Sequence, residues 1–229
     1  MKQITKNLEP RTLVQHRAQK GTYGDLPTAT KDELRNSLLS EQGHICCYCM
    51  KRIPQKLKQE EIDKNYPSSK IEHVNCQSLH NDKDLNYSNM LLACNGNHGS
   101  PKIMLTCDSY KGERDLSFNP SDTRNIESLI RYRANGEIFS DDKTIDSELN
   151  SVLNLNTKDL VDIREVFYKK IQQQIILEGK KRKGKDIQKR FYENEMGKLL
   201  TQNSGKYIPY CMVGVYLIEK KLDKLINSQ

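Results

Sequence analysis

Apolar residues recur at helical spacing in the first part of the chain. Leu34, Leu38 and Leu39 would lie on one face of a helix. We expect this helix to begin at a capping sequence, Thr30-Lys31-Asp32-Glu33, and to end at Gly43. Residues 1–28 show no sustained periodicity, so the pattern predicts an irregular arm there.

The next apolar residues come in short runs that polar segments separate. Residues 71–74 are short, residues 90–93 are compact and apolar, and both segments are expected to be extended. Residues 54–69 and 75–88 are polar and are predicted to be loops. A short helix that carries Lys111 and Arg114 is expected after Cys107. The order is therefore strand, loop, strand, helix.

The pattern changes near residue 125. Asn135-Gly136 stands between two apolar runs, and this pair favours the type I′ turn of a β-hairpin. Apolar residues then recur every three or four positions from Leu160 to Ile175 and again between residues 207 and 226, which predicts helices. We therefore expect an α+β fold that is mainly helical, with an N-terminal domain at 1–125 and a helical C-terminal region at 126–229.

Composition narrows the class of protein. The chain has 229 residues and a formal net charge of +7, with 35% hydrophobic and 29% charged residues. No apolar run approaches the roughly 20 residues that a membrane span needs, and the N-terminal residues lack a secretory signal. These features predict a cytoplasmic protein with no membrane partner. In a reducing compartment, its seven cysteines are more typical of metal binding than of disulfides.

The spacing of the cysteines predicts a zinc site. Cys46-x-x-Cys49 has the spacing of one zinc knuckle, and Cys94 and Cys107 are the natural second pair. The alternative is that they are small buried apolar residues. Asn97 stands where a second C-x-x-C would end, so His98 or Cys76 could replace Cys107 as the fourth ligand. Cys211 lies in a helical stripe and is expected in the core.

Polar residues around these cysteines have the chemistry of phosphodiester hydrolysis. His73 is a candidate base, because the pKa of histidine lies near neutrality. Glu72 and Asp108 are hard oxygen ligands that suit Mg²⁺ or Mn²⁺. Asn89 follows His73 by sixteen residues, and Lys111 follows Asp108 by three. Each residue alone is weak evidence, and the ordered set carries the prediction.

This set resembles the HNH endonucleases with the ββα-metal fold, and within them the nuclease subunit of Septu-type and retron-linked anti-phage systems. The shared motifs are L-R-x-x-L-x-x-E-Q at 34–42, C-x-Y-C at 46–49, I-E-H at 71–73, N-M-L-L-A-C-N-G-N at 89–97, C-D-x-x-K-G at 107–112 and Y-R-A-N-G-E-I at 132–138. One departure is Asp108, which occupies a position that Asn or His often holds in the wider class.

The resemblance implies a role for each residue. His73 would deprotonate the attacking water, and Glu72 and Asp108 would hold one catalytic Mg²⁺ or Mn²⁺ ion, with Glu72 orienting a side chain as its alternative role. Asn89 would brace the loop that aims His73, and Lys111 would lie near phosphate. The implied partners are nucleic acid, an ABC- or SMC-like ATPase subunit and, in retron systems, a reverse transcriptase with its RNA–DNA hybrid.

A basic segment lies in the second half of the chain. Residues 169–190 hold nine Lys or Arg against two acids, with Lys180, Lys181, Arg182 and Lys183 at the centre. Such a run predicts either a phosphate-binding track or a solvated connection between helices.

The rival to a nuclease is a non-catalytic, zinc-stabilised module that binds nucleic acid or serves as an adaptor. This module would use the same cysteines and the same basic run, but it does not explain why Glu72 and His73 accompany them.

Overall fold

The computed structural model describes residues 1–55, 68–179 and 181–227. The helices are α1 (Arg11–Ala18), α2 (Thr28–Glu41), α4 (Cys107–Lys111), α5 (Ile126–Leu129), α6 (Lys143–Ser151), α7 (Lys158–Gly179), α8 (Lys185–Leu200) and α9 (Cys211–Asn227), with 3-10 turns at Asn81–Lys83, Tyr87–Asn89 and Lys102–Met104. The strands are β1 (Ser69–His73), β2 (Met90–Cys94), β3 (Arg131–Tyr132) and β4 (Ile138–Phe139). The fold is therefore α+β, and helices make up about half of the described chain.

The first sheet consists of β1 and β2, which pair antiparallel with Glu72 opposite Leu91 and His73 opposite Met90. Every residue of β2 is buried. A strand that is covered on both faces is apolar throughout rather than alternating, which explains its sequence, Met-Leu-Leu-Ala-Cys. Helices α2 and α4 both contact β2. Strand, strand and helix thus follow one another in the chain and pack together, as the sequence predicts.

Helix α1 corrects the expectation of an irregular arm over residues 1–28. It begins directly after Pro10, whose φ of −57° suits a helix start. Leu13 is its single buried residue. An apolar stripe that is one residue wide leaves no periodicity in the sequence, which is why the pattern missed this helix.

Helix α2 is confirmed, but its predicted start is wrong. It begins at Thr28, directly after Pro27, and no side chain caps it. Thr30 lies buried inside the helix rather than at its cap. Pro27, whose φ is already −57°, explains the earlier start. The buried face of Leu34, Leu38 and Leu39 is as predicted.

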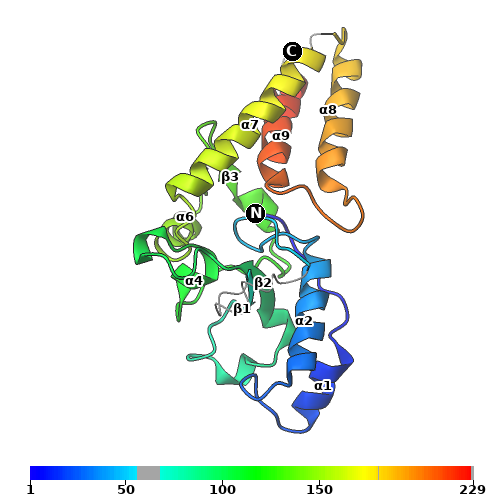
Figure 1. Cartoon of the computed structure of the whole chain (residues 1–229). Coiled ribbons are helices and arrows are strands. Elements are labelled where there is room, and N and C mark those ends of the chain that lie inside the picture. The colour runs from blue at the N-terminus through cyan, green and yellow to red at the C-terminus, as the bar shows by residue number, and fades with distance from the viewer. Residues whose placement is uncertain (56–67, 180, 228–229) are drawn as a thin grey trace.

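The second half of the chain holds the predicted hairpin and helices, but the predicted type I′ turn is wrong. That turn needs a positive φ at both central residues, and Asn135 does not have one. The turn instead runs from Arg133 to Gly136, whose N–H donates to the Arg133 carbonyl at 3.0 Å. β3 and β4 flank Asn135-Gly136, and Gly136 has φ +89°, where a Cβ would lie 2.1 Å from the Val161 carbonyl oxygen. Helices α7, α8 and α9 form one end of the molecule, and α1, α2 and the β1–β2 sheet lie toward the other end (Figure 1). Helix α9 buries Cys211 to Ile218, with the exception of Tyr216, against α7, α8 and β3.

Three other predicted boundaries are wrong, partly outside the described residues, or still untested. Arg114 lies beyond α4, which ends at Lys111. Most of the predicted 54–69 loop, residues 56–67, lies outside the described residues. The buried apolar cluster includes residues from both sides of position 125, so the domain boundary there stays a prediction. In the described part of the chain, no helix is long and apolar enough to cross a membrane.

Candidate metal centre and catalytic cavity

Four buried cysteines converge on one point. Their sulfur atoms all lie within 4.8 Å of one another, and the residues are Cys46, Cys49, Cys94 and Cys107. The sulfur of Cys107 lies 3.8 Å from those of Cys46 and Cys94, and Cys49 lies 3.7 Å from Cys94. Zinc binds thiolates at about 2.3 Å, so the edge of a tetrahedral site is about 3.8 Å. The spacing of the sulfur atoms therefore fits a tetrahedral zinc ion.

The backbone around the cluster is shaped to bring the sulfurs together. Cys46 and Cys49 lie in a tight turn that the Ile45–Arg52 bridge closes, Cys94 ends β2 and Cys107 begins α4. The Lys51 backbone N–H donates to the Cys49 sulfur at 3.4 Å. Met50 and Cys107 have positive φ angles of 62° and 53°. Such angles cost of the order of 1–3 kcal/mol in non-glycine residues and concentrate at functional sites, so they support a constrained centre here.

The thiol groups are too crowded to lose all their protons without a cation. Burial alone would raise the pKa of Cys46, but hydrogen bonds from Cys107 and the other cysteines hold it well below its usual range. The bond from Cys107 to the Cys46 sulfur, with the remaining cysteines and burial, raises the pKa of Cys107 well above its usual range. One thiolate is thus stabilised by its protonated neighbours. A divalent cation is the group that could stabilise four.

The alternative fourth ligands lie elsewhere. The Cys76 sulfur donates to the Glu113 carbonyl at 3.1 Å and contacts Ser78. His98 is exposed, with its Nδ1 3.4 Å from the Lys70 ammonium. Among the described residues, the cluster that could hold a metal contains neither of them. Cys107 is therefore the fourth cysteine of the centre.

A polar cavity of about 200 Å³ lies beside the metal centre. Its walls include Glu72, His73, Asp108 and Lys111, four residues that the sequence singled out. Glu72 and His73 come from β1, and Asp108 and Lys111 come from α4. The strand–helix arrangement thus collects the predicted acid, base and cation around one space.

The imidazole of His73 is held in one orientation. Its Nε2 lies 2.9 Å from the Asp84 carbonyl oxygen. A carbonyl only accepts hydrogen bonds, so Nε2 carries the proton and Nδ1 carries the lone pair. The edge of Tyr23 packs against the ring at a centroid distance of 4.6 Å. Burial lowers the pKa of His73, which favours the neutral form that a base requires.

Glu72 belongs to a buried network. Its Oε1 accepts from the Tyr48 hydroxyl at 2.7 Å and lies 3.0 Å from the Lys111 ammonium. Burial and the adjacent Asp108 raise the pKa of Glu72 well above its usual range, whereas Lys111 and Tyr48 oppose that shift. One carboxylate oxygen is thus committed to the protein, which is the orienting role that the sequence left open for Glu72.

Lys111 lines the cavity but is bonded to the protein. Its side chain is only 1% exposed, and its ammonium lies 3.0 Å from Glu72 Oε1 and donates to the His73 carbonyl at 2.9 Å. These contacts join α4 to the end of β1. The role near phosphate that the resemblance implies for Lys111 stays a prediction.

Asp108 is the more accessible acid of the cavity. Its side chain is 22% exposed, and its Oδ2 lies 3.6 Å from the Lys70 ammonium. Asp108 directly follows Cys107, so the cysteine cluster and the cavity share this stretch of backbone. A hard cation that entered the cavity would meet Asp108 before the remaining oxygen of Glu72, whose side chain is 1% exposed.

Asn89 braces the loop between β1 and β2. Its Nδ2 donates to the carbonyls of Asn75 at 3.0 Å and Lys83 at 3.3 Å, and its Oδ1 accepts from the Asn75 N–H at 2.8 Å. The same loop carries Asp84, the partner of His73. These bonds have the form that the resemblance implies for Asn89.

The basic segment lies away from the cavity. Lys180 lies outside the described residues, and Lys181 and Arg182 pair with Glu178 at 2.7 Å and 3.2 Å. Arg182 also lies over the Phe191 ring, 4.1 Å from its centroid. Lys183 is exposed. The turn between α7 and α8 that carries them is at the end of the molecule opposite α1, far from β1 (Figure 1).

Two tyrosines contribute to the site although the sequence analysis gave neither of them a role. Tyr48 stands between the two knuckle cysteines and donates to Glu72. Tyr23 comes from the segment between α1 and α2, and its backbone N–H donates to the Asp84 carboxylate at 2.9 Å. Both act through contacts between distant segments, which no local pattern reveals.

Comparison of the chain with protein-family models and with curated proteins gave no match.

Proposed function

We propose that this chain is a metal-dependent endonuclease of the HNH type that hydrolyses phosphodiester bonds, with DNA the first substrate to test and RNA, including tRNA, the second. One observation carries the proposal. The polar cavity brings His73, oriented with Nδ1 as its lone-pair nitrogen, together with the carboxyl groups of Glu72 and Asp108. A base beside hard oxygen ligands is the equipment of metal-assisted hydrolysis.

In this proposal the chain's own residues accept one proton and hold one cation. His73 accepts a proton from water at Nδ1, while the Asp84 carbonyl holds the proton at Nε2 and stabilises the charged ring. Asp108, and Glu72 through its second oxygen, would hold Mg²⁺ or Mn²⁺. When bound there, that cation would neutralise charge on the phosphate and on the leaving oxygen. Lys111 holds Glu72 in place and opposes the rise in the pKa of Glu72 that burial causes.

The cysteine cluster would hold a structural zinc ion. Four protein ligands close the coordination shell, which is typical of structural rather than catalytic zinc. Its contribution to the reaction is to fix Asp108 and α4 against β1.

The biological setting of this proposal rests on the motif resemblance alone. It would make the chain the toxic effector of a bacterial anti-phage complex with an ABC- or SMC-like ATPase, with or without a retron reverse transcriptase and its RNA–DNA hybrid. The exposed Lys183 and its neighbours in the 180–183 segment would add phosphate affinity at a distance from the cleaved bond.

The experiment compares cleavage of plasmid DNA and of total cellular RNA by the purified chain with and without the ATPase subunit. Mg²⁺, Mn²⁺ and EDTA are tested for wild type, His73→Ala and the control His16→Ala. His16 is a half-buried histidine of α1 whose Nε2 lies near the Thr22 carbonyl and Asp25. Cation-dependent cleavage that His73→Ala abolishes and His16→Ala retains supports the proposal.

The second candidate is a non-catalytic zinc module that binds nucleic acid. It is favoured by the mutual neutralisation of Glu72 and Lys111, which needs no substrate. It predicts nucleic-acid binding without cleavage in every condition, and equal binding by wild type and His73→Ala.

A further inference from the structure

Arg164 is a buried cation without an acidic partner. It is 1% exposed, and its guanidinium donates to the Gly136 carbonyl at 2.6 Å, the Leu155 carbonyl at 2.7 Å and the Asn156 side-chain oxygen at 3.1 Å. All three acceptors are neutral. Within the described parts of the chain, its remaining nitrogen, NH1, is buried and has no hydrogen-bond partner.

A buried charge of this kind requires compensation. Moving a cation out of water costs several kcal/mol, and buried charges in proteins are generally paired. Among the residues that the structure describes, no carboxylate forms a salt bridge with Arg164. Asp162 and Glu165, its neighbours on α7, pair instead with Lys158 and Lys169.

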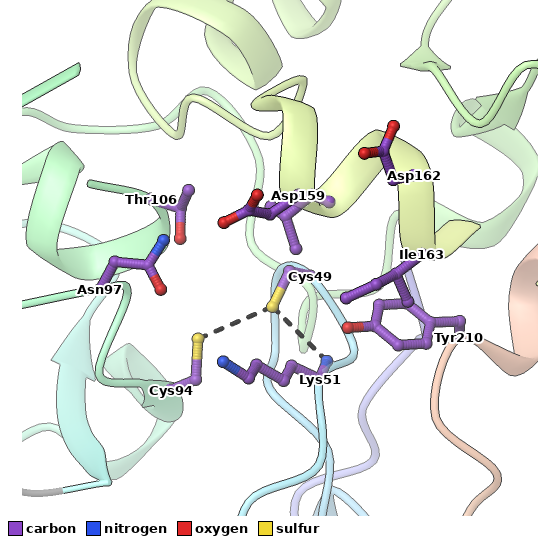
Figure 2. Close-up of a pocket in the computed structure, with 10 residues that line it drawn as sticks. Cys49, Lys51, Cys94, Asn97, Thr106, Asp159, Asp162, Ile163 and Tyr210 are labelled. Carbon is purple, nitrogen blue, oxygen red and sulfur yellow. Dashed lines mark hydrogen bonds between the residues drawn. The ribbon is translucent and has the colours of Figure 1, made fainter. Parts of the chain in front are cut away.

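A short segment of the chain connects Arg164 to the cysteine cluster. The segment 153–156 links the two, because the Leu153 carbonyl accepts from the Cys107 N–H at 2.9 Å and the Leu155 carbonyl accepts from Arg164. One α-helical turn before Arg164, Leu160 lines a cavity of about 330 Å³ together with Cys49 and Cys94. Figure 2 shows α7 across this cavity from the two sulfur atoms.

The electrostatics of the region agree with this placement. Burial lowers the pKa of Arg164, and Cys49 and Cys107 are among the groups that act in the opposite direction. Burial raises the pKa of Tyr210, the cysteines raise it further and Arg164 lowers it. Tyr210 lines the same cavity and therefore senses both charges.

Four thiolates around a divalent cation carry a net charge of −2. We propose that Arg164 is the built-in counter-charge of this metal–thiolate centre, and that it couples helix α7 to metal binding. The other charges at the cavity do not supply this compensation, because Lys51 is exposed and shares the cavity with Asp159 and Asp162. The inference rests on the metal centre and is independent of nuclease activity.

The coupling is reciprocal. If metal binding stabilises the position of Arg164, then Arg164 must stabilise the bound metal by the same free energy. Without metal, the centre of net charge −2 does not form, and Arg164 keeps only the neutral acceptors named above. Removing the charge should therefore harm the metal-loaded protein more than the metal-free protein.

The test uses the full chain loaded with Zn²⁺ and measures zinc affinity by competition with a chromophoric chelator. Arg164→Met removes the charge, Arg164→Lys retains it, and Ile163→Ala is the control, because Ile163 lines the same cavity without charge. Arg164→Met is expected to lower zinc affinity by about 10- to 100-fold, as loss of an outer-shell partner typically does. Arg164→Lys and Ile163→Ala should remain close to wild type.

The second measurement is the thermal midpoint of each variant with and without metal. The proposal requires Arg164→Met to lower the midpoint of the loaded form more than that of the metal-free form. Equal losses in both forms, or equal zinc affinities for Arg164→Met and wild type, overturn it. If Arg164→Met does not fold, the rate of zinc release from loaded Arg164→Lys is measured instead. Arg164→Lys keeps the charge but not the hydrogen bonds of the guanidinium. Fast zinc release from this variant would show that the hydrogen bonds alone matter, and it would refute the proposal.

Discussion

Replacing Lys111 by Met tests whether Glu72 is a buried, charged group. The Lys111 ammonium lies 3.0 Å from Glu72 Oε1, and both side chains are 1% exposed. The substitution removes the ammonium and keeps most of the stem. Glu72 then retains the Tyr48 hydroxyl at 2.7 Å as its remaining donor, and the His73 carbonyl loses its partner at 2.9 Å.

The expected cost follows from burial. Breaking a buried ion pair by removal of one partner costs about 3–5 kcal/mol, because an uncompensated charge remains. An exposed pair contributes about 0–1 kcal/mol. Lys158 and Asp162 provide the matched control, since they lie 2.5 Å apart with side chains 84% and 53% exposed. Lys158→Met should therefore leave the free energy of unfolding nearly unchanged.

Urea denaturation followed by circular dichroism measures both free energies, with zinc held saturating so that the metal centre contributes equally. The double variant Glu72→Gln/Lys111→Met closes a thermodynamic cycle. Its loss should be smaller than the sum of the single losses, because it removes both charges. A Lys111→Met cost as small as that of Lys158→Met, or additive losses, would refute the reasoning.

Three further predictions concern the metal, the loop and the base. Chelation of zinc should lower the unfolding temperature strongly, because structural zinc supplies folding free energy, and re-addition of zinc should restore it. Calorimetry measures this temperature. An unfolding temperature that chelation leaves unchanged would contradict a zinc centre. Asn89→Ala should lower the free energy of unfolding by about 1–3 kcal/mol, because buried N–H and C=O groups lose their hydrogen-bond partners. The same change should speed hydrogen exchange in the 75–84 loop. Unchanged exchange would show that Asn89 does not hold this loop in place. Burial lowers the pKa of His73 from 6.5, so its neutral form persists to lower pH. The acidic limb of a cleavage rate–pH profile should therefore lie below 6.5, and a midpoint above that value would exclude His73 as the group that titrates.

Part of this architecture follows directly from local sequence. The apolar run of β2, the Asn135-Gly136 turn and the stripes of α2, α7 and α9 each depend on residues close together in the chain. The spacing of Cys46 and Cys49 is equally local. The expectation that a zinc ion takes four ligands added Cys94 but left Cys107, His98 and Cys76 open as the fourth, and the structure selects Cys107.

Other features depend on contacts between distant segments and left no local signal. Nothing near Lys111 in the sequence indicates that it lies under Glu72, thirty-nine residues earlier. The contacts of Tyr48 with Glu72, and of Tyr23 with His73, are of the same kind. Arg164 appeared as one charge among many on a helix, yet its burial makes it unlike the others. Helix α1 was missed because Leu13 alone anchors it.

One peptide bond connects the cysteine cluster to the polar cavity. Cys107 is a cysteine of the cluster, and Asp108 lines the cavity. The positive φ of Cys107 is a strained backbone conformation, so a metal–sulfur bond that holds Cys107 also holds the direction in which Asp108 leaves the backbone. Loss of the structural metal should therefore displace the cavity's accessible acid while β1 and its His73 remain paired with β2. The proposed nuclease would then lose activity at lower chelator concentrations than those that unfold the chain.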